Sequence, residues 1–249
     1  MNWLAYYTER KARDFVVQTI ENYVRLRRGA FVLDVGCGPG KWVSLFAESG
    51  FVVTGVDASP WMIRLAKKKT KEDAKGQVEF YVMNVAKLAL PTNNYDLVNC
   101  VTVLQHIFGD EDWRNAVHGM VNVTKPFGHI LIFEAAPSFI LKKRTRHLRF
   151  RSMKDYTDEF RKAGAELAYW KATDLSFPIT YLGLRRYAAS FSKKVYRITD
   201  GFPALSPGFL SLMSRISMFL AKPIDYKLTL TPLGFLSIGK ILLFRKVKA

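Results

Sequence analysis

Residues 31–42 of the 249-residue chain read FVLDVGCGPGKW, and this stretch decides the fold. Its first five residues predict a buried strand, and glycines follow at the alternate positions 36, 38 and 40. Glycine lacks a Cβ, so such a segment can turn sharply and bring its backbone close to a ligand. A helix predicted to begin at Lys41 completes a site for a nucleotide-like ligand, because backbone N–H groups and the helix dipole meet there.

Strand and helix patterns alternate along the rest of the chain. Strands separated by helices of about ten residues predict right-handed crossovers and a mostly parallel sheet that is covered on both faces. The predicted strands are 31–35, 51–57, 78–84, 95–103, 129–135, 165–171 and 240–247. The predicted helices are one or two within 3–26, then 41–50, 59–72 (N-cap Ser59, first residue Pro60), 110–123 before a KPFG turn, and 152–164 (N-cap Ser152).

These elements predict the fold class. It is an α/β fold with a Rossmann-like, doubly wound, mostly parallel sheet of seven strands, of which the last is antiparallel. A helical insertion precedes the final strand, because about 65 residues are too many for an ordinary connection. Residues 209–220 of this insertion are amphipathic, and three roles are open: packing on their own domain, closing over an apolar ligand, or docking on a membrane.

The bulk composition limits the compartment and the partners. Two cysteines, Cys37 and Cys100, are too few for a disulfide framework or a metal cluster and favour a reducing, intracellular setting. The amino-terminal residues are too polar for a signal peptide, and no apolar stretch is long enough to cross a bilayer, so we expect a cytoplasmic protein. The net charge of +17 favours anionic partners (nucleic acid, acidic lipid or phosphorylated small molecules) or simply a solvated surface.

The glycine spacing argues against phosphate-bearing ligands. The dinucleotide fingerprint G-x-G-x-x-G/A is absent, because Gly40 is followed by Lys41 and Trp42, and there is no phosphate-binding loop ending in G-K-[ST]. Asp34 lies two residues before the first glycine, where we expect it at the mouth of the loop, and its carboxylate repels phosphate and favours an ammonium group. Asp57, at the end of the second predicted strand, can accept two hydrogen bonds from ribose hydroxyls, or it can cap the following helix. S-adenosylmethionine has the required cationic end and ribose, and it has no phosphate.

Three motifs carry a resemblance to a known family. VLDVGCGPG (32–40) resembles the pattern V-L-D-x-G-C-G-x-G of the class I S-adenosylmethionine-dependent methyltransferases, in particular their type 11, ubiquinone-biosynthesis-like group. VTGVDASPWMIRLAKK (53–68) resembles that family's second motif, and YDLVNCVTVLQHI (95–107) resembles its fourth. The resemblance spans roughly residues 28–136. It implies a cofactor site made of Asp34, Gly36, Cys37 and Gly38 around the methionine moiety, Asp57 at the ribose, Ala58 and Met62 near the adenine, and Val101 lining the cleft.

The third motif departs from the family pattern. The family usually places an Asp after the third strand to accept a hydrogen bond from the adenine amino group, whereas this chain has Asn84 followed by Val85. An amide oxygen can accept the same bond, so we expect both residues to belong to the cofactor site.

His106 and Glu134 are the titratable candidates for catalysis, because they follow the fourth strand and end the fifth. Methyl transfer needs a positioned nucleophile that loses a proton, so His106 is a candidate general base, although it can instead brace the pocket. Glu134 can orient an acceptor amine or hydroxyl, or it can cap a turn. No Asp/Asn-Pro-Pro-Tyr segment is present, which argues against methylation of an adenine amine or a glutamine amide. Cys100 lies within a strand, and no metal-ligand spacing is evident.

The resemblance also suggests how the chain is divided. Residues 1–27 are expected to form a helical lid, 28–172 with 239–249 the methyltransferase core, and 173–238 a cap on the acceptor side. The basic run from Lys142 to Arg151 predicts either a clamp for phosphate or carboxylate, or a solvated linker.

The resulting hypothesis is methyl transfer to an oxygen or nitrogen of a small, anionic or lipid-linked metabolite, with peripheral membrane contact as one option. Two alternatives stay open. The charge, with aromatic residues among the basic ones, favours a tRNA or rRNA methyltransferase, and a cofactor-binding scaffold without catalysis needs only the cofactor motifs.

Overall fold

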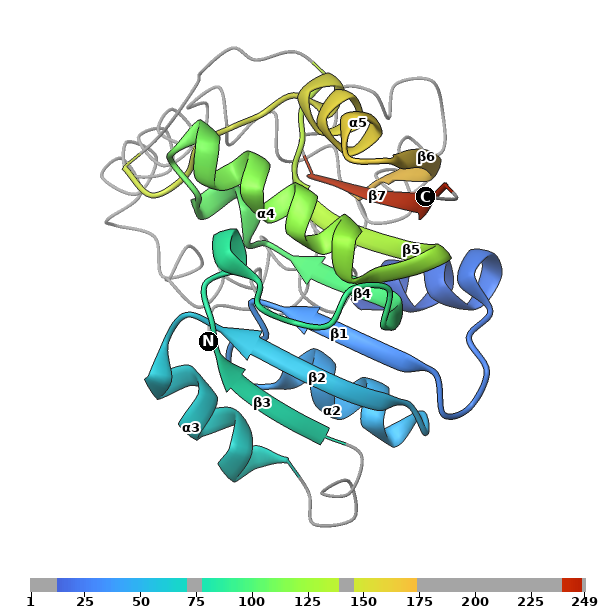
Figure 1. Ribbon diagram of the computed structural model, residues 1–249, viewed down its shortest axis with the longest axis vertical. Helices are drawn as coiled ribbons and strands as arrows, with labels where there is room; N and C mark the ends of the chain where they lie inside the picture. The colour runs from blue at the N-terminus through green and yellow to red at the C-terminus, as the bar shows by residue number, and fades with distance from the viewer. Residues whose placement is uncertain (1–12, 71–77, 139–145, 174–238, 248–249) are drawn as a thin grey trace, which may run out of the picture. The chain divides into compact units, whose positions relative to one another are not determined.

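A computed structural model of the chain describes residues 13–70, 78–138, 146–173 and 239–247 (Figure 1). The chain divides into two compact units, one made of Met1–Lys171 with Lys240–Ala249 and the other of Ala172–Gly239. The predicted lid at 1–27 is described from residue 13 onward. Apart from Thr173, the predicted cap at 173–238 lies outside the described residues, and so does its amphipathic segment at 209–220.

A seven-stranded sheet forms the centre of the first unit. Its strands are β1 (Phe31–Val35), β2 (Val52–Asp57), β3 (Val78–Val82), β4 (Tyr95–Val101), β5 (Thr124–Ala135), β6 (Ala165–Ala172) and β7 (Gly239–Lys246). Their order is β3-β2-β1-β4-β5-β7-β6. β1 pairs in parallel with β2 and β4, β2 with β3, and β4 with β5. Figure 1 shows β7 running in the opposite direction, so the predicted Rossmann-like sheet with an antiparallel last strand is confirmed.

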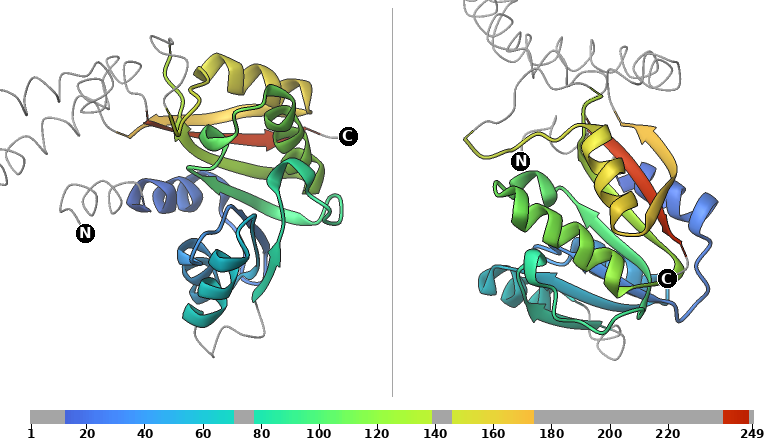
Figure 2. Two further views of the ribbon diagram at one scale, coloured as in Figure 1. Left: turned by 90° about the vertical axis from the view of Figure 1, so that its left-hand side faces the viewer. Right: turned by 45° about the horizontal axis from the view of Figure 1, so that its top comes forward.

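Helices cover both faces of this sheet. Residues 13–19 are α-helical and continue into the π-helix η1 (Ile20–Val24). The other helices are α2 (Lys41–Glu48), α3 (Pro60–Lys69), α4 (Asp110–Val123) and α5 (Met153–Lys162), with short 3-10 turns η3 (Val85–Lys87) and η4 (Leu104–His106). α4 and α5 pack into one core, whereas residues 13–19, α2 and α3 pack into the other (Figure 2). Strand side chains alternate between the two, so Leu33 faces the first core and Val32 the second.

Local sequence signals set several helix boundaries as predicted. The side chain of Ser59 accepts a hydrogen bond from the Met62 N–H at 3.3 Å, and Pro60 is the first residue of α3. Ser152 begins α5 with a capping box, in which the carboxylate of Asp155 accepts from the Ser152 N–H at 2.7 Å. These caps satisfy N–H groups that a helix leaves without partners at its start.

The start of β5 differs from the prediction. The strand was expected to begin at 129 after a turn, but it begins at Thr124, opposite Tyr95. The pairing then jumps to Leu97 opposite His129, so the KPFG residues form a bulge within the strand, with Phe127 at φ 63°. A Cβ on Gly128 would lie 3.1 Å from the Asp96 carbonyl oxygen, so glycine is needed where the bulge crosses β4. The Pro-Phe-Gly signal therefore marks a bulge and not the end of a connection.

A buried lysine joins the last strand to the rest of the sheet. The ammonium of Lys246 donates to Asn93 Oδ1 at 2.8 Å and to the carbonyl oxygens of Val121 and Thr124 at 2.9 Å. These three acceptors belong to the turn before β4, the end of α4 and the start of β5, so one side chain holds three segments to β7.

We expect Lys246→Met to lower the free energy of unfolding by about 2–4 kcal/mol, because it leaves three acceptors without their charged donor. Urea unfolding measures this loss. The matched control is Lys154→Met on α5, where the side chain is 79% exposed and pairs with Asp158. That control should change stability by less than about 0.5 kcal/mol. Equal losses in both variants would contradict a special role for Lys246.

Candidate active site

The glycine loop between β1 and α2 is held against the end of β2. The Gly38 N–H donates to Asp57 Oδ2 at 3.0 Å, and the Cys37 N–H donates to the Val56 carbonyl at 2.9 Å. Gly36, Gly38 and Gly40 all have positive φ, at 66°, 51° and 82°. Side chains with a Cβ adopt this region at a cost, so the loop requires glycine for its backbone conformation.

The three glycines differ in their surroundings. A Cβ on Gly36 would lie 2.3 Å from Val103 Cγ2, and one on Gly40 would lie 3.1 Å from the Cβ of Ala66. A Cβ on Gly38 would meet nothing within 4 Å. Gly36 and Gly40 therefore pack against the protein, whereas Gly38 leaves open space next to the loop.

Asp57 connects the glycine loop to the start of α3. Besides accepting from Gly38, its carboxylate accepts from the Ser59 N–H at 2.8 Å through Oδ1. The N-cap of α3 is Ser59 itself. Asp57 is only half-buried, and each carboxylate oxygen can accept a second hydrogen bond. Both oxygens can thus still receive ribose hydroxyls while they hold the backbone.

The residues predicted to surround the adenine lie at the same edge of the sheet. Ala58 is exposed and Met62 half-buried at the start of α3. The Met83 N–H donates to the Asp57 carbonyl at 3.0 Å, which places exposed Asn84 and half-buried Val85 just beyond β3.

The Asn84 side chain already has a structural role. Its Oδ1 accepts from the Ala86 N–H at 2.9 Å and so starts η3. One acceptor position of the amide is therefore used by the backbone. Val101 is half-buried at the end of β4, and Thr102 beside it has a strained φ of 57° for a β-branched residue.

The sequence placed Asp34 at the open mouth of the loop, but the structure buries its side chain. It is 1% exposed, because it alternates onto the same face of β1 as Val32, under helical cover. Asn99 on the neighbouring β4 donates to Asp34 Oδ1 at 2.7 Å. Within the described part of the chain, Asp34 Oδ2 and Asn99 Oδ1 have no hydrogen-bond partner. Burial raises the pKa of Asp34 from 3.8 to about 7, against the opposing effect of the Asn99 hydrogen bond.

The two thiols are inert by comparison. Burial raises the pKa of Cys37 well above its ordinary value, and the carboxylates of Asp34 and Asp57 raise it further. Cys100 is fully buried, and its pKa is raised by the same cause. Both thiols therefore stay protonated, and Cys37 contributes to the loop through its backbone.

Glu134 is buried and engages the turn after β4. Its carboxylate accepts three backbone hydrogen bonds, from Val103 at 2.7 Å, Leu104 at 2.8 Å and Gln105 at 3.2 Å. Burial still raises its pKa from 4.5 to about 7. Of the two roles predicted for Glu134, these contacts favour the one in which it caps a turn.

His106 is exposed on that turn, and its ring is fixed by one hydrogen bond. Its Nδ1 lies 3.0 Å from the carbonyl oxygen of His147. A carbonyl oxygen only accepts, so the hydrogen of the neutral ring belongs on Nδ1 and the lone pair on Nε2. His106 and Glu134 therefore share one turn, but in different ways: the first presents a ring to solvent and the second supports the backbone from within.

Arg149 and Arg151 are not a free clamp for anions. The guanidinium of Arg151 is buried, stacks over Trp113 at 4.6 Å and donates to the Ile107 carbonyl at 3.0 Å. It also bonds the carboxylate of Asp110 at 3.2 Å, and Arg149 binds the same carboxylate at 2.6 Å. Neither the anion clamp nor the solvated linker describes these two arginines, because their guanidinium groups already bind backbone carbonyls and the Asp110 carboxylate within residues 104–110. Residues 139–145 lie outside the described part.

The family profile with the description "Methyltransferase domain" matches residues 32–128. This range contains the glycine loop, Asp57, Asn84 and the turn with His106. Residues 32–128 are a class I S-adenosylmethionine-dependent methyltransferase domain.

Curated relatives of the methyltransferase domain carry quinone-related names. The chain is 36% identical over 106 residues to the mitochondrial ubiquinone biosynthesis O-methyltransferase of Schizosaccharomyces pombe, covering 42% of this chain and 37% of that protein. It is 28% identical to the demethylmenaquinone methyltransferase of Lactococcus lactis subsp. lactis, covering 60% of each. The chain thus spans less than two thirds of the length of these two relatives. Among solved structures, the [4+2]-cyclase SpnF shares the fold, with a TM-score of 0.63 and 21% identity over 95% of this chain and 81% of that one.

The described residues fit the cofactor of this family, S-adenosylmethionine. Gly38 leaves open space beside the loop, Asp57 offers two partly used carboxylate oxygens, and Asp34 has a buried oxygen without a partner. The carboxylate of Asp57, joined by that of Asp34 when it is ionised, supplies negative charge, which suits a cationic nucleoside. Among the described residues, no three His, Cys, Asp or Glu side chains are grouped so that they could hold a metal ion. In the same residues, no helix has the length and apolar character needed to span a bilayer.

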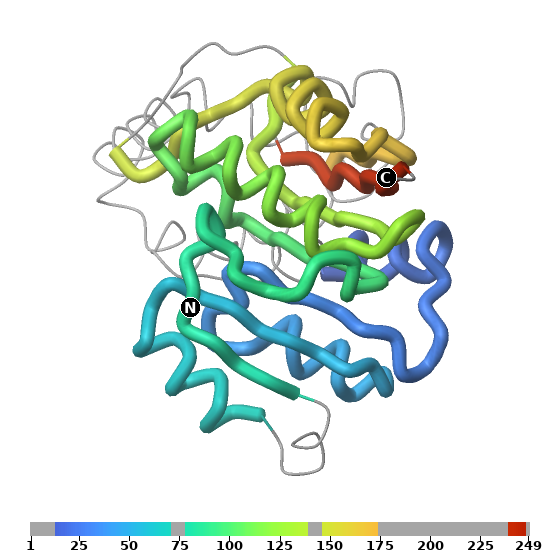
Figure 3. The backbone as a smooth tube through the Cα atoms, in the orientation of Figure 1, coloured from blue at the N-terminus to red at the C-terminus, as the bar shows by residue number. Residues whose placement is uncertain are grey.

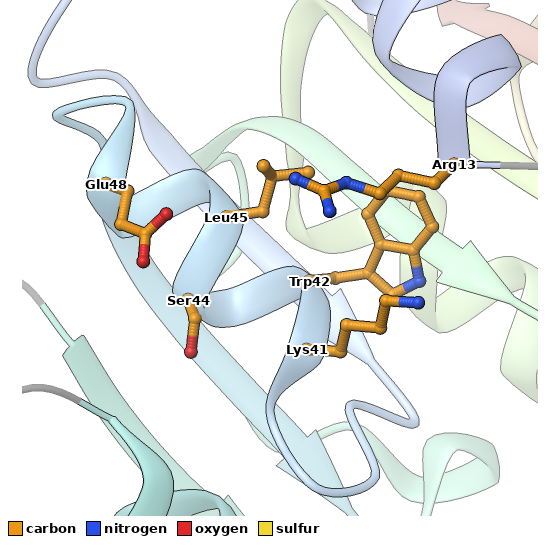
Figure 4. A pocket seen from close by; sticks show the side chains of 6 residues that line it. All are labelled: Arg13, Lys41, Trp42, Ser44, Leu45 and Glu48. Atoms are coloured by element: carbon orange, nitrogen blue, oxygen red, sulfur yellow. The ribbon is translucent and has the colours of Figure 1, made fainter. Parts of the chain in front are cut away.

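A separate hollow of about 230 Å³ lies along the outer side of α2 (Figure 4). In Figure 4 the side chain of Arg13 reaches over Trp42 toward Leu45. The lining of this hollow includes none of the predicted cofactor residues, so the hollow belongs to the contact between the helix at 13–19 and α2. The lining residues are Arg13, Lys41, Trp42, Ser44, Leu45 and Glu48.

Sequence reasoning missed Asn99 and Gln105. Asn99 is fully buried in an apolar strand and pairs with Asp34, and the Gln105 side chain accepts from the Ala135 N–H at 3.1 Å. For Asn99 a signal existed, since a polar residue in a strand that is otherwise apolar on that face needs a buried partner. For Gln105 none did, because it lies in a turn, where polar residues are common, and its partner is 30 residues away in the chain.

We expect Gly38→Ala to weaken S-adenosylmethionine binding at least tenfold, because its Cβ enters the open space beside the loop. The positive φ should also cost about 1–2 kcal/mol of stability. Calorimetry and urea unfolding measure the two effects. The matched control is Gly29→Ala, which has φ 80° and likewise no atom within 4 Å of the added Cβ, but lies before β1. It should lose similar stability and keep its affinity. A control that loses as much affinity would show that strain alone explains the result.

We expect the stability contributed by Asp34 to fall as the pH rises from about 4 to 7 and to stay level above that. The sign follows because the folded state, with the raised pKa, binds more protons than the unfolded state over this range. Asp34→Asn should remove this dependence and raise stability at pH 8, by up to about 4 kcal/mol. Urea unfolding at several pH values compares the two proteins. An unchanged difference between them across this range would contradict a raised pKa.

Proposed function

We propose that this protein transfers a methyl group from S-adenosylmethionine to an oxygen or nitrogen of a small, lipid-linked acceptor of the quinone class. Two relatives with quinone-related names support the acceptor class. The turn at residues 103–106 carries the proposal, because it contacts the glycine loop through Val103 and presents the ring of His106.

Different residues of the chain would bind the cofactor and the methyl acceptor. Asp57, Gly38 and Asp34 would hold the cofactor, which supplies a methyl group on a positively charged sulfur. His106 would accept the proton of an acceptor hydroxyl or amine at Nε2, since its Nδ1–H is committed to the His147 carbonyl. Glu134 would keep the turn in place through its three backbone hydrogen bonds.

The decisive experiment follows methyl-labelled S-adenosylmethionine into separate reduced-quinone, phospholipid and RNA fractions. Label in the quinone fraction supports the proposal. Label in RNA alone would favour the tRNA or rRNA alternative instead. Tight cofactor binding without product in any fraction would favour a scaffold or another reaction, which the shared fold with a protein named as a cyclase leaves open.

We expect His106→Asn to reduce the rate of methyl transfer by about 10²–10⁴-fold, the usual contribution of a general base. Its affinity for S-adenosylmethionine should stay unchanged, because an amide N–H can replace the bond to the His147 carbonyl. His118→Asn is the control, since His118 is also partly exposed but pairs with Glu159 on α5. A full rate in His106→Asn, or equal losses in both variants, would rule out His106 as the base.

A further inference from the structure

A basic hollow lies at the amino-terminal edge of the sheet, at the other end of β1 from the glycine loop. Its volume is about 400 Å³, which is in the range of small-ligand sites. The loop before β1 forms one wall and the bulge of β5 the other. Both lie on the right of Figure 3.

The cations of this hollow outnumber its anions. Arg25, Arg27, Arg28 and Lys125 line it, with Asp96 as the single carboxylate. Asp96 already accepts from Lys125 at 2.8 Å and from the Phe31 N–H at 2.9 Å. Within the described ranges, none of the three arginines forms an ion pair.

The wall that carries the arginines is fixed by backbone hydrogen bonds. The Gly29 N–H donates to the Gly50 carbonyl at 2.8 Å, and the Ala30 N–H donates to the Arg27 carbonyl at 3.0 Å. The side chain of Arg28 packs across Gly50, where a Cβ would lie 2.9 Å from its Nε. A guanidinium in a fixed loop is suited to bind phosphate oxygens in pairs.

The opposite wall offers exposed aromatic surface. Phe127, at the bulge, is 51% exposed at a positive φ, and Arg245 lies over its ring at 5.4 Å. Phe31, the first residue of β1, does not line the hollow, but its ring lies 5.2 Å from the ammonium of Lys125, which does. His129 also lines the hollow, and its pKa is lowered by burial and by Arg245.

We propose that this hollow is a second ligand site, which binds a phosphorylated small molecule with a planar ring, of the nucleoside-phosphate class. The phosphate contacts Arg27 and Arg28, and the ring lies against Phe127. A concave hollow receives one such molecule, whereas a flat bilayer cannot enter it. The site is independent of methyl transfer, because it lies at the far end of β1.

Inorganic pyrophosphate and uridine monophosphate are the probes, with uridine as the phosphate-free comparison. Binding is measured by calorimetry with the cofactor site saturated, and by NMR titration of the His129 ring. Both phosphates should bind and shift the His129 titration to higher pH, and uridine should not bind.

Arg27→Gln/Arg28→Gln should weaken both phosphates about tenfold, because it removes charge-assisted hydrogen bonds. The control Arg64→Gln/Lys68→Gln on α3 changes the net charge equally and should leave affinity unchanged. Phe127→Ala should weaken uridine monophosphate but not pyrophosphate, and it tests the site even if the double variant does not fold. S-adenosylmethionine binding, measured in every variant, should stay constant.

Three outcomes would overturn this site. The first is no binding of either phosphate at millimolar concentration. The second is equal weakening in the Arg64→Gln/Lys68→Gln control, which would mean that only net charge matters. The third is binding to phosphatidylglycerol vesicles without binding of the soluble phosphates, which would make the surface a membrane contact.

Discussion

The carboxylate of Asp57 is the contact on which the candidate site depends. One of its oxygens accepts from the loop after β1 and the other from the residue that caps α3. Two successive crossovers are thereby fixed to the end of one strand. The loop needs this support because its three glycines, with no side chains of their own to anchor it, all have positive φ. Asp57 can therefore serve the backbone and a ribose at once, since a carboxylate accepts more than two hydrogen bonds.

The turn after β4 is held from two sides by opposite charges. Glu134 accepts from three N–H groups at its start, and Arg151 donates to carbonyl oxygens toward its end. The backbone N–H and C=O groups of a turn lack the partners that a strand or helix supplies, so they need side-chain partners where water cannot reach them. The ring of His106 therefore lies at the surface on a turn whose backbone is fixed at residues 103–105 and 107. Both charged residues thus act through the position of the backbone.

Polar groups in the described part of the molecule are distributed unequally between the two edges of the sheet. The carboxyl edge carries Asp34, Asp57 and Glu134, with Arg151 near Glu134, and the amino edge carries the arginines of the basic hollow, with Asp96 as its one carboxylate. An acidic environment suits a sulfonium cofactor, and a basic one suits phosphate. Four of the basic residues behind the large net charge of the chain thus gather at one edge, away from the glycine loop.

The sequence alone determined the order of the elements and the cofactor loop. Apolar runs such as 31–35, the helix at 110–123 and the caps Ser59 and Ser152 are local signals, and a residue's neighbours in the chain suffice to set them. The tertiary structure decided which groups pair. Asn99 is 65 residues from Asp34, Glu134 is 31 from Val103 and Arg151 is 44 from Ile107, so no spacing in the chain predicted these partners. The same reason explains why the sequence placed Asp34 at the mouth of the loop and predicted an anion clamp that included Arg149 and Arg151. The burial of a side chain depends on what packs over it, and the packing is set only when the strands and helices come together.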